Sequence, residues 1–422
     1  MNWGNQIGRF RWLHLFSDNL IGTMQLSASR YVSNFEVATV QNENQGGRGF
    51  GLNRNNSLVD LSAKADFDYY VNANHKSKAG FQLTQYDAEY RQGTQDTARS
   101  AINSVSIYST GYWEHSWRIG RLKLVSGLRA SYFGSGNYTD YSPRVSGLFQ
   151  WNEKLAFKAG WGMYHQYVNL ISVEGFSFTT DMWLPVDETL DPGQAEHRAF
   201  GFTLIPSDGW EVDLEFYHKE MEKLVEFQSQ VRLDDSTPLS DLFLQGGGTS
   251  YGGEFLLRRT EGRTTGWIGY TLSKTENTFQ DLNNGTPFPP KYDRRHDLSV
   301  VLDHFLGRGW NANVSWVYGT GQAYTIPESR YSVVQPSGQA ISFVHVSEKN
   351  AFRLPPYHRL DLGLTRNFNW GALNGEIVLS VFNVYNRRNI WYRTFDVSED
   401  VIEFQDVMLQ PILPSIGFKF KL

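Results

Sequence analysis

The most constraining feature of this chain is a strict alternation of apolar and polar side chains that continues to its last residues. In Pro414–Leu422 the apolar set is Ile416, Phe418, Phe420 and Leu422, and the alternate set is Ser415, Gly417, Lys419 and Lys421. A period of two is that of a β-strand. Soluble proteins rarely end inside an apolar strand, because termini are usually loose and polar. A closed barrel ends in this way, since its last strand pairs with its first and leaves no edge.

The same alternation recurs upstream, at 59–69, 155–163, 210–216, 298–302, 310–318 and 360–368. The runs are about 9–12 residues long, near the length that a tilted strand needs to cross a bilayer. Apolar residues make up only 40% of the chain, and no stretch of 18 apolar residues offers a membrane-spanning helix. Strands escape that criterion, because one side of each faces a polar lumen. We therefore expect an all-β, antiparallel transmembrane barrel.

The connections between runs alternate in length. Short turns are expected at 120–121, 152–153, 207–209, 261–263, 307–309 and 370–372, and longer polar stretches at roughly 166–196, 228–250, 277–293, 320–356 and 386–410. Outer-membrane barrels have short periplasmic turns and long extracellular loops. Five tryptophans, at positions 117, 151, 210, 310 and 370, lie near the short turns, as expected of residues that prefer the membrane interface. We predict about 16–18 strands, the first two at roughly 8–17 and 20–31, and a loop at Gln45–Gly51.

Composition excludes several classes of function. A net charge of −5 without a basic stripe argues against a nucleic-acid partner. The chain has no Cys, which removes disulfides, thiolate metal sites and thiol nucleophiles. The ten His show no zinc-binding spacing, and no nucleophile-elbow or phosphate-loop motif is present. We expect neither a cofactor, a metal site nor an enzyme, although distant strands could still assemble Ser, His and Asp.

The start Met1–Gln6 has no basic or long apolar region, and so no signal peptide. An outer-membrane protein requires one. We therefore expect that it was removed, or that the true start lies upstream.

The C-terminal segment resembles the assembly signal of bacterial outer-membrane proteins. Four residues fit that pattern, with a leucine where the final aromatic usually stands: Ser415, Gly417, Phe420 and Leu422. The resemblance implies recognition by the outer-membrane assembly machinery and residence in the outer membrane of a Gram-negative-type bacterium.

An ordered set of further motifs resembles the barrel of TonB-dependent outer-membrane receptors. The motifs are Gly127–Arg129, Ser142–Arg144, Ser250–Phe255, Gly269–Ser273, Phe288–Asp297, Arg353–Leu364 and Val381–Asn389. Such receptors have a barrel of about 22 strands with a plugged lumen. The resemblance implies that residues 1–422 are one N-terminally shortened barrel, lacking the plug and the first strands. It implies energy-coupled import of a scarce ligand, such as a ferric siderophore, cobalamin or an oligosaccharide, with TonB contacted through the missing region.

Two groups of residues are candidates for ligand contact. A charge cluster at the barrel rim or lumen comprises Asp293, Arg294, Arg295, Asp297, Arg359 and Asp361. It could grip an anion or the plug, but we favour pairing between lumen charges of neighbouring strands. The expected loops also carry many aromatics, which could stack on a ligand or on one another: Tyr164, Tyr167, Phe176, Phe178, Trp183, Tyr324, Tyr331, Phe343, Trp391 and Tyr392, together with His165.

Other classes remain open on the sequence alone. A passive porin-like channel needs no more than 16–18 strands. An outer-membrane enzyme and a soluble all-β protein are the remaining alternatives.

Overall fold

The computed structural model describes residues 2–38, 51–94, 97–174, 179–227, 243–334, 340–346, 348–370, 373–396 and 402–421. Their principal secondary structure is β-strand, and seventeen of the strands belong to one antiparallel sheet. No helix among these residues has the length and apolar character needed to cross a membrane. The sheet predicted from the sequence, with about 16–18 strands, is therefore confirmed.

The strands of the main sheet follow one another along the chain. They are β1 (Asn2–Ser17), β2 (Leu20–Ala38), β3 (Gly51–Asn72), β4 (His75–Thr94), β5 (Thr97–Ile119), β6 (Leu122–Phe133), β7 (Tyr138–Gln150), β8 (Leu155–Gln166), β11 (Gly193–Leu204), β12 (Trp210–Phe227), β13 (Phe243–Arg259), β14 (Thr264–Thr278), β15 (His296–Gly307), β16 (Trp310–Gly319), β21 (Tyr357–Trp370), β22 (Leu373–Phe382) and β25 (Leu413–Lys421).

Among the described residues, four smaller two-stranded sheets and one short helical turn lie in the long connections. The sheets are β9 (Val168–Glu174) with β10 (Thr179–Pro185), β17 (Ala323–Tyr324) with β20 (Phe352–Arg353), β18 (Ser329–Val334) with β19 (Ala340–His345), and β23 (Ile390–Asp396) with β24 (Glu403–Met408). The helical turn is η3 (Asn283–Gly285). The Gln45–Gly51 loop predicted from the sequence lies almost wholly outside the described residues.

The chain divides into two compact units. Unit 1 comprises Met1–Gly147, Gly160–His197 and Glu220–Gly247. Unit 2 comprises Leu148–Ala159, Arg198–Lys219 and Gly248–Leu422.

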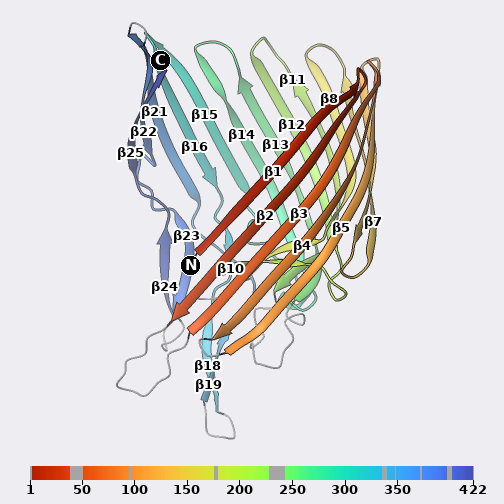
Figure 1. Ribbon diagram of the computed structural model, residues 1–422. Coiled ribbons are helices and arrows are strands. Elements are labelled where there is room, and N and C mark those ends of the chain that lie inside the picture. The colour runs from red at the N-terminus through yellow and green to blue at the C-terminus, as the bar shows by residue number, and fades with distance from the viewer. Residues whose placement is uncertain are drawn as a thin grey trace. The chain divides into compact units, whose positions relative to one another are not determined.

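In unit 1 the apolar face of the sheet is the exposed one. Leu26 lies opposite Ala63 and Ala63 opposite Leu83, so these residues share a face, on which Leu83 is 43% exposed. On the other face Thr84 is 1% exposed, and its hydroxyl lies 2.8 Å from that of Ser62. Water-soluble proteins bury apolar and expose polar groups, so this sheet has the reverse arrangement. Figure 1 shows β1 to β5 side by side.

Unit 2 repeats the arrangement on β15, β16 and β21. Leu302, Val314 and Leu362 lie opposite one another on one face. Next to them, on the other face, the Asn313 amide donates a hydrogen bond to the Asp303 carboxylate. Charged and polar side chains on the inward face are paired with one another, whereas the apolar side chains on the outward face are left uncovered by the sheet. Such a face is stable only when the surrounding medium is itself apolar.

The short turns that fall on described residues lie where the sequence predicts them, and residues 371 and 372 of the turn predicted at 370–372 lie outside the described residues. The chain reverses between β5 and β6 at 120–121, between β13 and β14 at 261–263, and between β15 and β16 at 307–309. Gly309 has φ +79°, and a Cβ there would lie 2.6 Å from the Asn367 carbonyl oxygen. Both the backbone angle and the close contact require glycine in this turn.

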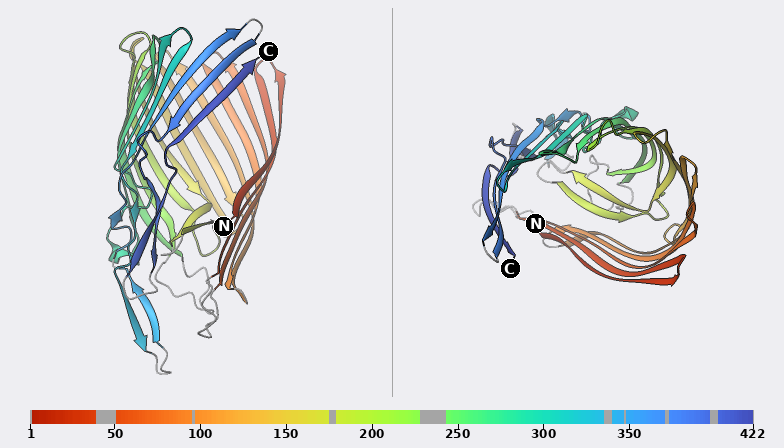
Figure 2. Two further views of the ribbon diagram at one scale, coloured as in Figure 1. Left: turned by 90° about the vertical axis from the view of Figure 1, so that its left-hand side faces the viewer. Right: turned by 90° about the horizontal axis from the view of Figure 1, so that it is seen from above.

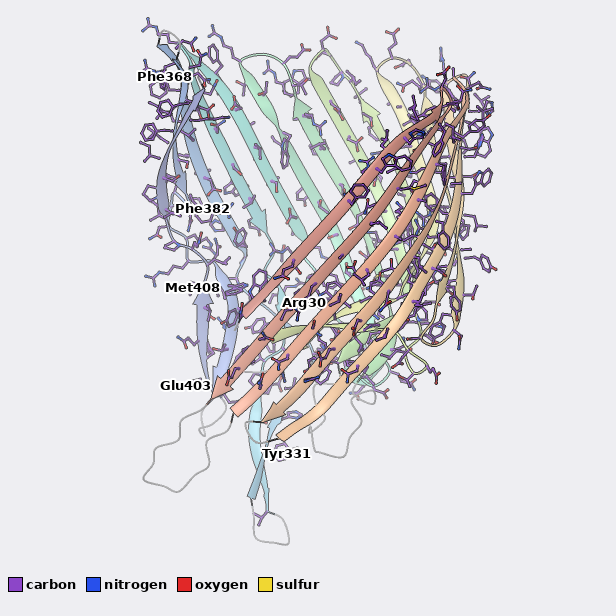
Figure 3. All side chains as sticks on the ribbon, viewed as in Figure 1. Arg30, Tyr331, Phe368, Phe382, Glu403 and Met408 are labelled. Atoms are coloured by element: carbon purple, nitrogen blue, oxygen red, sulfur yellow. The ribbon has the colours of Figure 1, made fainter. Side chains whose placement is uncertain are left out.

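The C-terminal segment forms a strand, as the sequence predicts. In the β22–β25 ladder Gly375 lies opposite Phe420, and the hydroxyls of Ser380 and Ser415 are 2.7 Å apart. Phe420 packs edge-on against Phe368, with ring centroids 6.4 Å apart. Figure 3 marks Phe368 and Phe382 toward opposite ends of this part of the sheet. Ile416, Phe418 and Phe420 remain 57–61% exposed, so this strand also turns its apolar face outward.

The reversed arrangement predicts which substitutions prevent membrane insertion. Val314→Arg places a charge on the outward face and should destabilise the folded protein in lipid by about 2–4 kcal/mol. Its neighbour Asn313 is the matched control, because Asn313→Arg points inward toward Asp303. Folding into lipid vesicles, followed by the migration of unheated samples on gels, measures both. Equal tolerance of the two variants would contradict the assignment of faces.

Candidate functional site

The hairpin β9–β10 folds onto the polar face of unit 1. Its strand β10 contacts β3 and β4, and the Trp183 backbone N–H donates to the Asn56 side-chain oxygen at 3.1 Å. Asn56 is 4% exposed on the face that carries the buried polar groups. Trp183 also meets Tyr31 edge-on, with centroids 6.5 Å apart. Figure 2 shows the hairpin set apart from the strands of the main sheet.

The hairpin has an apolar core of its own. Ile171 and Met182 lie opposite each other in the ladder and are 2% and 1% exposed. Their cluster includes further residues from the hairpin, from β4 and from the strand ends that flank it: Leu184, Leu190, Tyr90, Phe227 and Phe243. This core fixes the hairpin by burial of apolar area, while the wall beneath it supplies hydrogen bonds.

The segment before the hairpin is fixed by Tyr167. Its ring stacks on Phe133 at 5.2 Å, and both rings are buried with Val186. The Tyr167 hydroxyl donates to Asp140 Oδ2 at 2.8 Å. The sequence placed Tyr167 among loop aromatics that contact either a ligand or one another, and the structure shows that it packs on aromatic neighbours.

Unit 1 also brings Ser, His and Asp together. Ser142 Oγ lies 3.0 Å from His165 Nδ1, and His165 Nε2 lies 3.6 Å from Asp140 Oδ1. A nucleophilic serine must meet its substrate, and Ser142 is only 3% exposed. In this arrangement the three side chains join the ends of β7 and β8. Sequence reasoning could not find the contact, because it depends on strand register.

In unit 2 an arginine joins two of the long connections, the one between β22 and β25 and the one between β16 and β21. Arg393 on β23 binds Asp406 on β24 through two nitrogens, at 2.5 and 2.9 Å, and its Nη1 donates to the Tyr324 hydroxyl at 2.9 Å. The guanidinium also lies 4.2 Å from the centre of the Phe404 ring. Hydrogen bonding to Asp406 raises the pKa of Arg393, so the side chain stays charged. Two-point pairing of this kind orients as well as attracts.

The predicted charge cluster divides into separate groups. Asp293 is 3% exposed, forms an ion pair with Arg353, and accepts a hydrogen bond from the Thr275 backbone N–H at 2.8 Å. Arg353 further donates to the Asp293 and Gly321 carbonyls, at 2.9 and 3.1 Å. The sequence does not predict Arg353 as the ion-pair partner of Asp293, because the two residues are sixty positions apart along the chain.

Among the described residues, the other members of the predicted cluster do not take part in the Asp293–Arg353 ion pair. Arg359 Nε donates to Asp361 Oδ2 at 2.9 Å, and Asp361 Oδ1 accepts from the Asn383 backbone N–H at 2.8 Å. Arg294 lies over the Tyr357 ring at 5.9 Å. Arg295 is half-buried and Asp297 exposed. These contacts suit an anchoring role for the charges, which remains a prediction.

Several predicted loop aromatics are exposed. Trp391 is 61% and Tyr331 52% exposed, on the hairpins β23–β24 and β18–β19. Figure 3 labels Tyr331 on β18, and Glu403 and Met408 at the two ends of β24. Phe176 and Phe178 lie outside the described residues, and so does the side chain of Phe343. Within the described part of the chain no three His, Asp or Glu side chains are grouped so that they could hold a metal ion.

The chain matches the family model described as TonB dependent receptor-like, beta-barrel, over residues 2–386. It therefore belongs to the TonB-dependent receptor-like β-barrel family. A search of curated proteins finds no match.

The fold is shared with solved outer-membrane receptors at low sequence identity. FpvA of P. aeruginosa, solved with heterologous pyoverdines, is 12% identical with a TM-score of 0.67 over 99% of this chain and 55% of its own. Fiu of E. coli K12, a ferric-catecholate import receptor, is 12% identical with a TM-score of 0.66 over 99% and 64%. The copper transporter OprC is 11% identical with a TM-score of 0.63 over 92% and 60%. The chain thus spans a little over half the length of these proteins.

The family confirms the fold class predicted from the sequence, an all-β transmembrane antiparallel barrel. Its members are receptors and transporters of the Gram-negative outer membrane rather than enzymes. The resemblance seen in the ordered motifs is confirmed by the same match.

The predicted charge cluster offers a matched pair of variants. Asp293→Ala removes the carboxylate that pairs with Arg353 and accepts from the Thr275 N–H, and should lower the free energy of unfolding by about 1–3 kcal/mol. Asp297→Ala, in the same motif but exposed, should change it by less than about 0.5 kcal/mol. Urea unfolding in detergent micelles measures the difference. Similar values for both variants would show that Asp293 is no anchor.

Proposed function

We propose that this chain is the barrel part of a receptor that imports a scarce ligand across the outer membrane with energy supplied through TonB. Membership of the family is the observation that carries the proposal. In this proposal residues 1–422 form an N-terminally shortened barrel, and the plug and the TonB-contacting segment lie outside them. The partial coverage of the solved receptors supports this.

Several features of unit 1 suit a receptor rather than an open pore. A passive channel needs a water-filled lumen. Here the β9–β10 hairpin covers polar groups such as Asn56, and it is held by the buried core around Met182. A segment packed on the inner face restricts passage until something displaces it.

The ligand is proposed as a ferric chelate, with cobalamin and oligosaccharide as the other candidates. FpvA is solved with pyoverdines and Fiu is a ferric-catecholate import receptor, which supports an iron chelate as the ligand. OprC is a copper transporter, so the ligands of similar structures also include copper. Exposed rings such as Trp391 and Tyr331 offer flat apolar surfaces at which either a planar chelate or a sugar can stack.

Assembly is proposed to use the C-terminal strand. Ser415, Gly417, Phe420 and Leu422 would be read by the outer-membrane assembly machinery before β25 pairs. The strand's exposed apolar face, with Phe418 and Phe420 stacked at 6.4 Å, supports a segment that is recognised in extended form.

Energy dependence separates the receptor from the porin-like channel. Cells expressing the complete gene should take up radiolabelled ferric chelate under iron limitation, and uptake should fall at least tenfold when a protonophore or loss of TonB removes the drive. A passive channel would keep its uptake in both cases. Planar-bilayer recording adds a second measurement, in which a steady conductance from the complete protein would favour the channel.

A disulfide can test whether the hairpin must move. The chain has no Cys of its own, so Asn56→Cys with Trp183→Cys places a single pair of thiols across the hairpin contact. Oxidation should reduce uptake at least tenfold, and reduction should restore it. Each single variant is the control. Full uptake with the disulfide formed would show that the ligand passes without displacement of β9–β10.

A further inference from the structure

Histidine and tyrosine pairs mark the outward face of unit 2. The Tyr270 hydroxyl lies 2.8 Å from His296 Nδ1, and the Tyr385 hydroxyl lies 2.8 Å from His358 Nδ1. Tyr270 and Leu298 are opposite each other, so this pair shares the face of the outward leucines. His358 lies opposite Tyr318, next to the outward Leu360. Both pairs lie toward the ends of β15 and β21 that lead into long connections.

With the tyrosine hydroxyl as the donor, each pair leaves the Nε2 proton of its imidazole free. A tyrosine hydroxyl that donates to Nδ1 of a neutral imidazole places the ring proton on Nε2. Among the described residues, neither His296 Nε2 nor His358 Nε2 has a hydrogen-bond partner. Their strands flank β16 and the two histidines are offset by two residues in register, so the two imidazoles are about 12 Å apart across the sheet.

A cation lies beside the second pair. Arg387 Nη2 donates to the Pro356 carbonyl at 3.0 Å, and the Asn389 amide donates to the His358 carbonyl at 2.9 Å. These bonds hold the segment after β22 along the start of β21. In the part of the chain that the structure describes, the Arg387 guanidinium pairs with no carboxylate. The patch formed by His296, His358 and Arg387 therefore offers donors and positive charge without an acid.

An apolar groove lies on β16, β21, β22 and β25, nearer the short turns than the patch. It has a volume of about 630 Å³, and its outward lining is Ala312, Val314, Leu362, Leu364, Leu379, Val381, Pro414 and Ile416. Two of its lining residues, Ala312 and Val314, have short side chains, whereas Trp316, further along the same face of β16, is large and does not line it. Leu362 and Leu364 continue the outward row that begins at His358.

We propose that this face binds one phosphate-bearing lipid of the outer leaflet, with its phosphate at the patch and an acyl chain in the groove. Continuity of the outward face carries the choice of a lipid. The groove faces hydrocarbon, and the patch lies at the end of the strands that lead into the long, extracellular connections. Charged donors suit phosphate oxygens, and unbranched chains suit a long apolar hollow. The inference concerns the outer wall and is independent of the transported ligand.

The headgroup half is tested with lipid A as probe, in its phosphorylated and dephosphorylated forms. The purified protein in detergent should bind the phosphorylated form at least tenfold more tightly, as measured by native mass spectrometry. His296→Phe with His358→Phe, and separately Arg387→Gln, should each remove most of that preference. His304→Phe is the matched control, since it breaks an outward pair with Thr264 near the short turns of the same strands.

The groove half is tested with Ala312→Phe, which fills the hollow and should weaken both forms of the lipid by about the same factor, roughly tenfold. Migration of unheated samples on gels checks that every variant is folded. Equal binding of the two lipid forms by the unaltered protein would overturn the proposal, as would an equal loss with His304→Phe. A dimer that the double histidine variant abolishes would also overturn it, because a second copy would then cover the patch.

Discussion

The structure depends on the medium that meets the apolar face of its strands. Leu83, Val314 and Phe418 point outward, while Thr84, Asn313 and Asp303 point inward to polar partners. In hydrocarbon the backbone cannot bond to a solvent, so every N–H and C=O must be paired within the sheet. The long antiparallel ladders meet that requirement, and the short turns with glycines such as Gly309 allow the chain to re-enter the sheet at once.

The sequence predicts strands well because the period of two is imposed by this medium. The turns at 120–121 and 307–309 and the strand at the C-terminus are confirmed because each depends on neighbours in sequence. The contacts of the long connections could not be predicted. Asp293 forms an ion pair with Arg353 rather than with Arg295, and Ser142 is hydrogen-bonded to His165, because strand register and loop folding determine which side chains come into contact. The sequence indicates the family only through several motifs that occur in the expected order along the chain.

The long connections combine two kinds of attachment. Arg393 joins Asp406 and Tyr324 through directional bonds, which fix the relative orientation of β23, β24 and β17 within unit 2. The β9–β10 hairpin of unit 1 relies chiefly on non-directional burial around Ile171 and Met182. A directional contact breaks over a small displacement, whereas an apolar core tolerates sliding. Directional bonds thus fix β23 and β24 in unit 2, whereas apolar burial chiefly fixes β9 and β10 in unit 1.

The separate core of the β9–β10 hairpin sets a threshold for any molecule that must pass it. Since the core around Met182 and Leu184 includes Tyr90 of β4, the hairpin can leave the wall that carries Asn56 only by opening that core and by giving up the Trp183–Asn56 hydrogen bond. A guest that binds solely to the uncovered state loses about tenfold in apparent affinity for every 1.4 kcal/mol by which the covered state is preferred. Under the proposed function, occlusion by the hairpin would then be enough for selectivity, because a molecule that binds weakly would not displace it even if no charge repels that molecule.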